Sequence, residues 1–237
     1  MNVGRDSMAM SRRVAAVSLL RLVGVLVLVG CSSRSVVPGA PTPDLTFPDG
    51  VPSHALSENV WVNSVERAQV AHAAAINAAD FSDPELSQLW SAGRVRSMVV
   101  SSQGDLLRGS VSVWLGPRPF EALEVVEASD GRSAEVIGCA AEPDIVSNIP
   151  RPTSDGRAAP FTYLLELSPD GHRQIVGAGR PSEPAELSDG RQVTEDYCST
   201  VEVRKGVFSP VPDLESLAGK DIDDVVPPAA PGAPVRP

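Results

Sequence analysis

The three histidines are the side chains of this 237-residue chain best suited to acid–base or metal chemistry. His54, His72 and His172 lie far apart in the sequence, and no pair has the spacing of metal ligands, so we expect no metal site. His72 falls on the apolar face of a predicted helix, where an imidazole facing a pocket could act as a general base or proton donor. The alternative is a histidine in or at the edge of the core whose ring nitrogens find their hydrogen-bond partners within the protein. The side chains that could line one modest pocket, or else fill the core, are His72, Trp61, Trp114 and Tyr163.

The chain lacks the short motifs of common hydrolases and nucleotide-binding proteins. It has no Gly-x-Ser-x-Gly elbow, no phosphate-binding glycine loop and no His-Glu-x-x-His sequence. Glu121, Glu124 and Glu127 fall on mixed faces of one predicted strand, which is typical of solvated positions rather than paired catalytic carboxylates. We therefore expect a protein that is not an enzyme and that holds no cofactor.

Cys31 follows a sequence that fits a secretory signal. Arg12, Arg13 and Arg21 supply positive charge, and residues 22–29 form an apolar run that is too short to span a bilayer. The sequence Leu28-Val29-Gly30-Cys31 resembles the lipobox of bacterial lipoprotein signals. The resemblance implies cleavage before Cys31 and attachment of a diacylglycerol to its thiol. An ordinary cleavage site and an uncut anchor helix are the alternatives.

The two remaining cysteines, Cys139 and Cys198, lie in predicted strands. Outside the cytoplasm two such cysteines usually pair, so export predicts a disulfide between them. Two buried free thiols are the alternative.

The charge of the chain limits its partners. It carries a formal net charge of -10 at pH 7 and only two lysines, Lys205 and Lys220. Nucleic-acid binding requires clustered Lys and Arg side chains, so we expect no nucleic-acid partner. The expected partners are the membrane, through the lipid anchor, and either a protein or a small apolar ligand. The expected location is the extracytoplasmic face of the cell membrane.

The first half of the domain is predicted to be helical. Apolar residues recur at helical spacing over residues 61–79. Residues 82–85, Ser-Asp-Pro-Glu, then start a second helix with a capping oxygen and a proline in the first turn. Gly93 is expected to break this helix, and Gly104 to end a further short one.

The second half is predicted to contain about six antiparallel strands. The alternation of side chains and the β-rich composition indicate strands at 110–115, 120–128, 133–141, 161–168, 172–179 and 197–205. Asp-Gly dipeptides at 130–131, 155–156, 170–171 and 189–190 supply the positive φ angles of tight turns.

Composition divides the chain into four parts. Residues 1–30 are the predicted signal peptide, and residues 31–54 are the lipidated cysteine with a proline-rich tether. Residues 55–209 form the expected α+β domain of N-terminal helices packed on a curved sheet. Residues 210–237 are a C-terminal extension whose Pro- and Ala-rich end is expected to be disordered.

The order of helices followed by an antiparallel sheet, behind a lipobox and a tether, resembles actinobacterial secreted lipoproteins with an NTF2-like domain. The resemblance spans about residues 55–209, and it depends on the Ala-rich first helix, the restart at 83–86 and the strand at 131–136 that leads to Cys139. It implies a cone-shaped α+β fold that serves for binding or assembly.

Three functions are compatible with this sequence. The first is a non-enzymatic envelope lipoprotein that binds a small apolar ligand or a protein partner. The second is a small-molecule isomerase or hydrolase with His72 or a carboxylate as base, and the third is an accessory subunit of a secretion or cell-wall complex. A cavity that holds His72 would favour the first two, and an exposed apolar patch on the sheet would favour the third.

Overall fold

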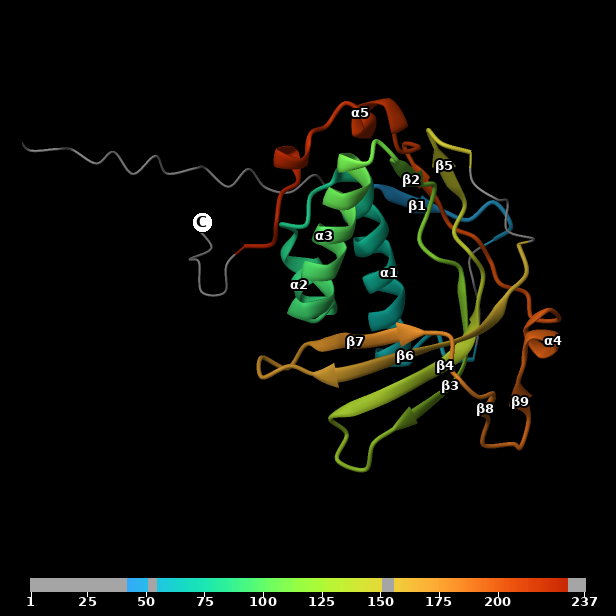
Figure 1. Ribbon diagram of the computed structural model, residues 1–237. Helices are drawn as coiled ribbons and strands as arrows, with labels where there is room; N and C mark the ends of the chain where they lie inside the picture. The colour runs from blue at the N-terminus through green and yellow to red at the C-terminus, as the bar shows by residue number, and fades with distance from the viewer. Residues whose placement is uncertain (1–41, 51–54, 151–155, 230–237) are drawn as a thin grey trace, which may run out of the picture. The chain divides into compact units, whose positions relative to one another are not determined.

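The computed structural model describes residues 42–50, 55–150 and 156–229, which form the predicted α+β arrangement of helices and antiparallel strands (Figure 1). The predicted signal peptide, Cys31 and most of the tether lie outside these residues. Within the described part, no helix is long and apolar enough to cross a membrane.

The helix predicted over residues 61–79 is α1 (Val60–Ala78). The side-chain oxygen of Asn59 caps it by accepting from two backbone N–H groups of the first turn, at 2.9 and 3.3 Å. Ala79 ends the helix with a left-handed φ of 48°. Its buried face, which includes Val65 and Ala68, belongs to the main core of the domain.

Two further helices follow, α2 (Pro84–Leu89) and α3 (Ala92–Leu107). The predicted start of α2 is confirmed, because Asp83 Oδ1 accepts from the Glu85 N–H at 2.8 Å. The predicted break between two helices is present, but it lies at Trp90 and Ser91 instead of Gly93, and the end predicted at Gly104 is wrong. Neither glycine has a positive φ, and both lie within α3, which ends at Leu107. Gly109, with a φ of 62°, then reverses the chain.

Four strands form the central antiparallel sheet in the order β3-β4-β6-β7. They are β3 (Phe120–Glu127), β4 (Ser133–Ala140), β6 (Ala159–Leu167) and β7 (Arg173–Gly179). Gly131 and Gly171, with φ of 65° and 82°, turn the two outer hairpins, as the Asp-Gly dipeptides predict. The main core lies between α1, α2 and one face of this sheet, where Val136, Tyr163 and Ile175 are fully buried. The predicted single sheet of about six strands is therefore wrong in its size.

The other strands form separate two-stranded ribbons. They are β2 (Ser112–Trp114) with β5 (Ile145–Ser147), β1 (Asp44–Thr46) with β10 (Val207–Ser209), and β8 (Ala185–Glu186) with β9 (Gln192–Val193). The sequence places β1 inside the extended tether. Its backbone instead pairs with β10, so residues 44–46 belong to the folded domain.

Residues 197–205, predicted as the last strand, form none. Thr194 Oγ1 accepts from the Tyr197 N–H at 3.1 Å and so caps a short helix, α4 (Glu195–Cys198). Cys198 is bonded to Cys139 of β4, which confirms the predicted disulfide. Both cysteines are fully buried in a second, smaller core on the outer face of the sheet, together with Ile137 and Val193.

The folded domain extends beyond residue 209, where the sequence places its end. Helix α5 (Leu214–Ala218) buries Leu217, and Val225 is buried in the same main core. The backbone of Val226 then bonds to the end of α1, accepting from the Phe81 N–H at 2.8 Å and donating to the Ala79 carbonyl at 3.0 Å. These contacts hold residues 214–226 against the helices.

Candidate functional site

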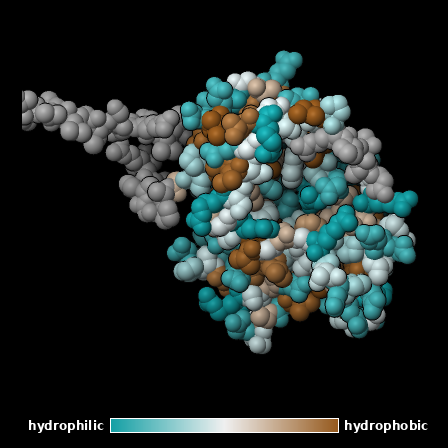
Figure 2. Space-filling view, in the orientation of Figure 1, coloured by the Kyte–Doolittle hydropathy of each residue, from teal (hydrophilic) through white to brown (hydrophobic). Residues whose placement is uncertain are grey.

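A cavity of about 540 Å³ lies between α1, α3 and the β2–β5 ribbon, and it reaches β6 and β7 of the sheet. Figure 2 shows the surface hollowed between these elements, with hydrophilic and hydrophobic side chains around the hollow. Its lining is amphipathic. Apolar lining residues include Ile76, Trp90, Met98, Leu106, Trp114, Ile145 and Phe161, and polar ones include Gln69, His72, Arg94, Ser97, Ser101, Arg118 and Tyr163. The volume lies within the range of small-molecule sites.

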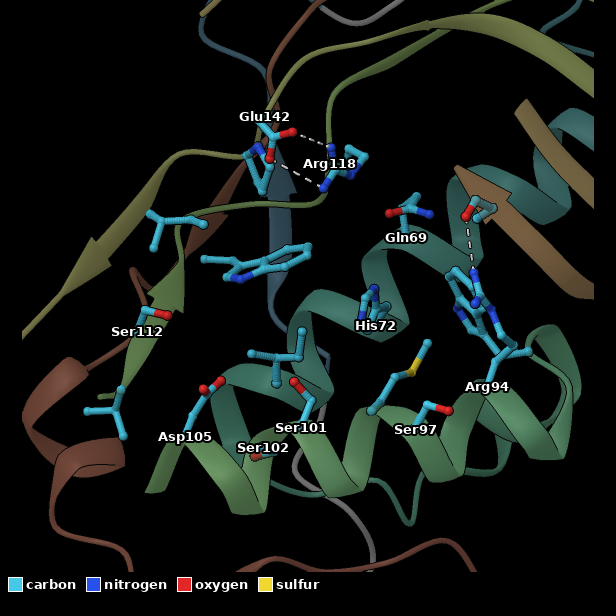
Figure 3. Close-up of a pocket in the computed structure, with 18 of the residues that line it drawn as sticks. Gln69, His72, Arg94, Ser97, Ser101, Ser102, Asp105, Ser112, Arg118 and Glu142 are labelled. Carbon is cyan, nitrogen blue, oxygen red and sulfur yellow. Dashed lines mark hydrogen bonds and ion pairs between the residues drawn. The ribbon is translucent and has the colours of Figure 1, made fainter. Parts of the chain in front are cut away.

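His72 projects from α1 into this cavity between two indole rings (Figure 3). Its ring centroid lies 5.3 Å from that of Trp90 and 5.2 Å from that of Trp114. Burial, together with the positive charges of Arg118 and Arg94, lowers the pKa of His72 from 6.5 to about 4. The imidazole is therefore neutral at pH 7, with one N–H donor and one acceptor nitrogen. Neither nitrogen has a hydrogen-bond partner among the described residues, so a ligand could use both.

Trp114 is fixed beside His72 by a side chain of α1. Asn77 Nδ2 donates to the Trp114 carbonyl at 2.8 Å, and Asn77 Oδ1 accepts from the Trp114 N–H at 2.7 Å. The carboxamide thus pairs with the backbone of β2 as a neighbouring strand would. On the other side of His72, Trp90 Nε1 donates to the Ala68 carbonyl at 2.8 Å, which fixes that indole as well.

We expect Asn77→Ala to lower the free energy of unfolding by about 2 kcal/mol, because both backbone groups of Trp114 lose their partner in a partly buried place. Chemical denaturation would measure the change. Asn63→Ala is the matched control, since Asn63 lies on the same helix and its side chain makes no hydrogen bond within the described residues. Equal effects of the two substitutions would contradict this role for Asn77.

The Tyr163 hydroxyl is a buried polar group at the cavity wall. The residue has no exposed surface, and its hydroxyl has no hydrogen-bond partner in the described part of the chain. The ring packs edge-on against Phe120, with centroids 4.9 Å apart. Burial raises the pKa of Tyr163 above its ordinary value, although the Arg118 charge opposes this rise. The group is therefore a neutral O–H, and leaving such a group unpartnered costs about 1–3 kcal/mol.

Two arginines give the cavity its charge, and they differ in their partners (Figure 3). Arg118, between Pro117 and Pro119, donates to both carboxylate oxygens of Glu142 at 3.2 and 3.4 Å. Its guanidinium also lies over the Phe161 ring, 5.3 Å from the centroid. Arg94 donates to the carbonyl of Ala178 at 3.2 Å, and no described carboxylate pairs with it.

The structure brings together three of the four residues expected at a pocket. His72, Trp114 and Tyr163 line the same cavity, whereas Trp61 does not. Trp61 is buried in the main core, and the Arg173 guanidinium lies 4.9 Å from its ring centroid. Cys139 and Cys198 lie in the second core, outside the cavity lining. Cys31 and His54 lie outside the described residues.

Sequence reasoning missed Gln69, Arg94 and Arg118. A signal for Arg94 is present in α3, where residues 94, 97, 98, 101 and 105 follow helical spacing and form a mixed polar and apolar stripe beside the buried Val95 and Val99. Such a stripe is typical of a helix face that lines a cavity rather than a core. Arg118 gives no comparable signal, because it lies in a loop.

Comparison with known proteins adds no relative. No protein-family model matches the chain, and neither curated proteins nor solved structures give a match. No group of three or more His, Cys, Asp or Glu side chains that could hold a metal ion occurs in the part of the chain that the structure describes. The function is therefore inferred from the geometry and the lining residues of the cavity.

Proposed function

We propose that this protein is a membrane-anchored envelope lipoprotein whose α+β domain binds a small, largely apolar molecule without transforming it. The observation that carries the proposal is the amphipathic cavity of about 540 Å³, which is lined by a neutral His72 and a buried, unpartnered Tyr163 hydroxyl. Unpartnered polar groups in a mostly apolar pocket are typical of ligand sites, because the ligand supplies the missing partners.

Lipid attachment and export are part of the same proposal. The lipobox at Cys31 supports them at the level of sequence, and the Cys139–Cys198 disulfide is consistent with an oxidising compartment. The NTF2-like family also remains a proposal. Helices that precede an antiparallel sheet, with a cavity between them, support it, whereas the four-strand size of the sheet does not.

An isomerase or hydrolase is the second candidate, because His72 and Tyr163 line the same cavity. A general base works best when its pKa lies near the operating pH. With a pKa of about 4, His72 is a weak base at neutral pH. No described carboxylate bonds to its ring to strengthen it, so the chemistry of His72 favours binding over proton transfer.

Docking of a protein partner has a weaker basis. Val126, Glu135 and Leu164 lie side by side in register on the outer face of the sheet. Val126 and Leu164 are 46% and 47% exposed. An acidic residue therefore separates the two apolar side chains, and this row offers less to an apolar partner than the cavity offers to a ligand.

Binding of N-phenylnaphthylamine, a neutral apolar fluorophore, tests the proposed function. We expect the full chain in detergent to bind this probe and Ser101→Phe to weaken binding at least about tenfold, because Ser101 points from α3 into the cavity and a phenyl ring would occupy ligand space (Figure 3). Probe emission excited through the three tryptophans would measure binding to the domain rather than to micelles, and the loss in Ser101→Phe would assign that binding to the cavity.

Val100→Phe is the matched control for this titration, since Val100 is the neighbouring residue on α3 and is 67% exposed. It should bind the probe as the unmodified chain does. If Ser101→Phe also binds the probe as tightly as the unmodified chain, the cavity is not the binding site.

A further inference from the structure

We infer that the ligand of this cavity is a small organic acid, with an apolar or aromatic body and one anionic group held by Arg94. The inference rests on the proposed function and names the class of ligand. It follows from the charges, the apolar surfaces and the unpartnered donors that line the cavity.

Arg94 is the one positively charged side chain of the described cavity lining that is not paired with a carboxylate. The two carboxylates of the lining are both paired, Glu142 with Arg118 at 3.2 Å and Asp105 with Arg108 at 2.6 Å. Arg94 donates only to a backbone carbonyl, that of Ala178. A guanidinium has five N–H donors, so most of those on Arg94 remain free for a ligand. The net charge of -10 repels an anion at a distance, so the attraction for an anion comes from this unpaired guanidinium at close range.

Neutral donors in the lining of the same cavity fit an anion as well. The Tyr163 hydroxyl lacks an acceptor among the described residues, and the carboxamide of the buried Gln69 makes no hydrogen bond there either. Figure 3 shows Gln69, His72 and Arg94 on neighbouring positions around one end of the cavity. A carboxylate accepts several hydrogen bonds at once, and a planar guanidinium matches its geometry.

Aromatic surfaces beside these groups fit the body of the ligand. The rings of Trp90, Trp114 and Phe161 line the cavity, and the first two flank His72. The indole N–H of Trp90 is bonded to the Ala68 carbonyl, so this ring offers only apolar surface. The two hydrogen bonds of Trp114 involve its backbone, so its indole N–H has no partner among the described residues and adds one more donor beside the aromatic surface. This combination of a cation, neutral donors and aromatic surface favours an amphipathic acid over a sugar or a nucleotide.

A matched pair of probes tests the inference on the full chain. Anilinonaphthalene sulfonate has the ring system of N-phenylnaphthylamine with an added sulfonate. We expect the unmodified chain to bind the anionic probe about tenfold or more tightly than the neutral one. Arg94→Gln should remove this preference and keep binding of the neutral probe, which shows in the same variant that the cavity is folded. Arg94→Lys should keep part of the preference.

Arg96→Gln is the matched control, because Arg96 lies on the exposed side of α3 and its loss changes the net charge equally. Equal binding of the two probes by the unmodified chain would overturn the inference but leave the proposed function in place. A preference that survives Arg94→Gln would overturn the role of Arg94. Failure of both probes to bind above the Ser101→Phe background would overturn the inference together with the proposed function.

Discussion

Replacing Cys139 and Cys198 together by alanine is expected to lower the free energy of unfolding by about 4 kcal/mol. The disulfide closes a loop with a sequence separation of 59 residues, and constraint of a loop of that length in the unfolded chain stabilises by about this amount. The bond also joins β4 to α4, and so it holds residues 185–198 over the outer face of the sheet. Alanine is preferred to serine because both positions are fully buried.

Chemical denaturation of the full chain, with and without reductant, would measure this loss. Reductant should destabilise the unmodified chain by a similar amount and leave the double alanine variant unchanged, which serves as the control. A loss below about 1 kcal/mol would show that the second core holds this segment without the covalent bond.

His72 is expected to make the folded protein less stable as the pH falls from 6.5 to about 4. In this range the unfolded chain binds a proton at His72, whereas the folded protein keeps the imidazole neutral. The unfolded state therefore holds more protons, and the free energy of unfolding falls as the pH falls. The full cost, reached below the folded pKa, is up to about 3 kcal/mol. The charged groups that act on the ring are Arg118 and Arg94, which stay protonated throughout.

The free energy of unfolding of His72→Gln, measured as a function of pH, would test this dependence. The variant should lose less stability than the unmodified chain between pH 6.5 and 4, because glutamine does not titrate. His172→Gln is the control for the loss of an imidazole at the surface, since His172 is exposed beside the β6–β7 turn, and its profile is compared with that of His72→Gln. Parallel profiles for His72→Gln and the unmodified chain would contradict the proposed burial of a neutral imidazole.

The sequence predicted the central elements of the fold correctly, because residues within or next to each element determine its conformation. Helix α1 follows from one apolar face at helical spacing, and α2 follows from a proline in its first turn after a capping residue. The β3–β4 and β6–β7 hairpins follow from Asp-Gly dipeptides, because glycine adopts positive φ without strain. Each of these signals lies within a few residues of the structure that it predicts.

The errors occur where distant residues decide the structure. Strand β1 lies among prolines typical of a tether, and its partner β10 is more than 150 residues away in sequence, as the pair Thr46 and Val207 shows. Residues 201 and 203 have the alternation of a strand, but no backbone partner is placed beside them, and they pack instead against the second core. The residues next to these segments in the sequence do not indicate which distant strand, if any, will pair with them.

The candidate site could be predicted only in part for the same reason. His72 was identifiable because α1 is a regular helix with one histidine on its apolar face. That Arg94 of α3 and Arg118 of a loop approach the same imidazole depends on how α3 and the β2–β5 ribbon pack, which no local pattern specifies. The size of the cavity depends on this packing as well.

The histidine ring signals of the full chain, followed by NMR as N-phenylnaphthylamine is added, test the central claim most directly. Because His72 lies between two indoles in the cavity lining, a bound naphthyl ring should shift its signals with the same dissociation constant as the fluorescence titration gives. The exposed His172 should not respond. A saturable probe signal that leaves His72 unshifted would place the ligand elsewhere and contradict the account.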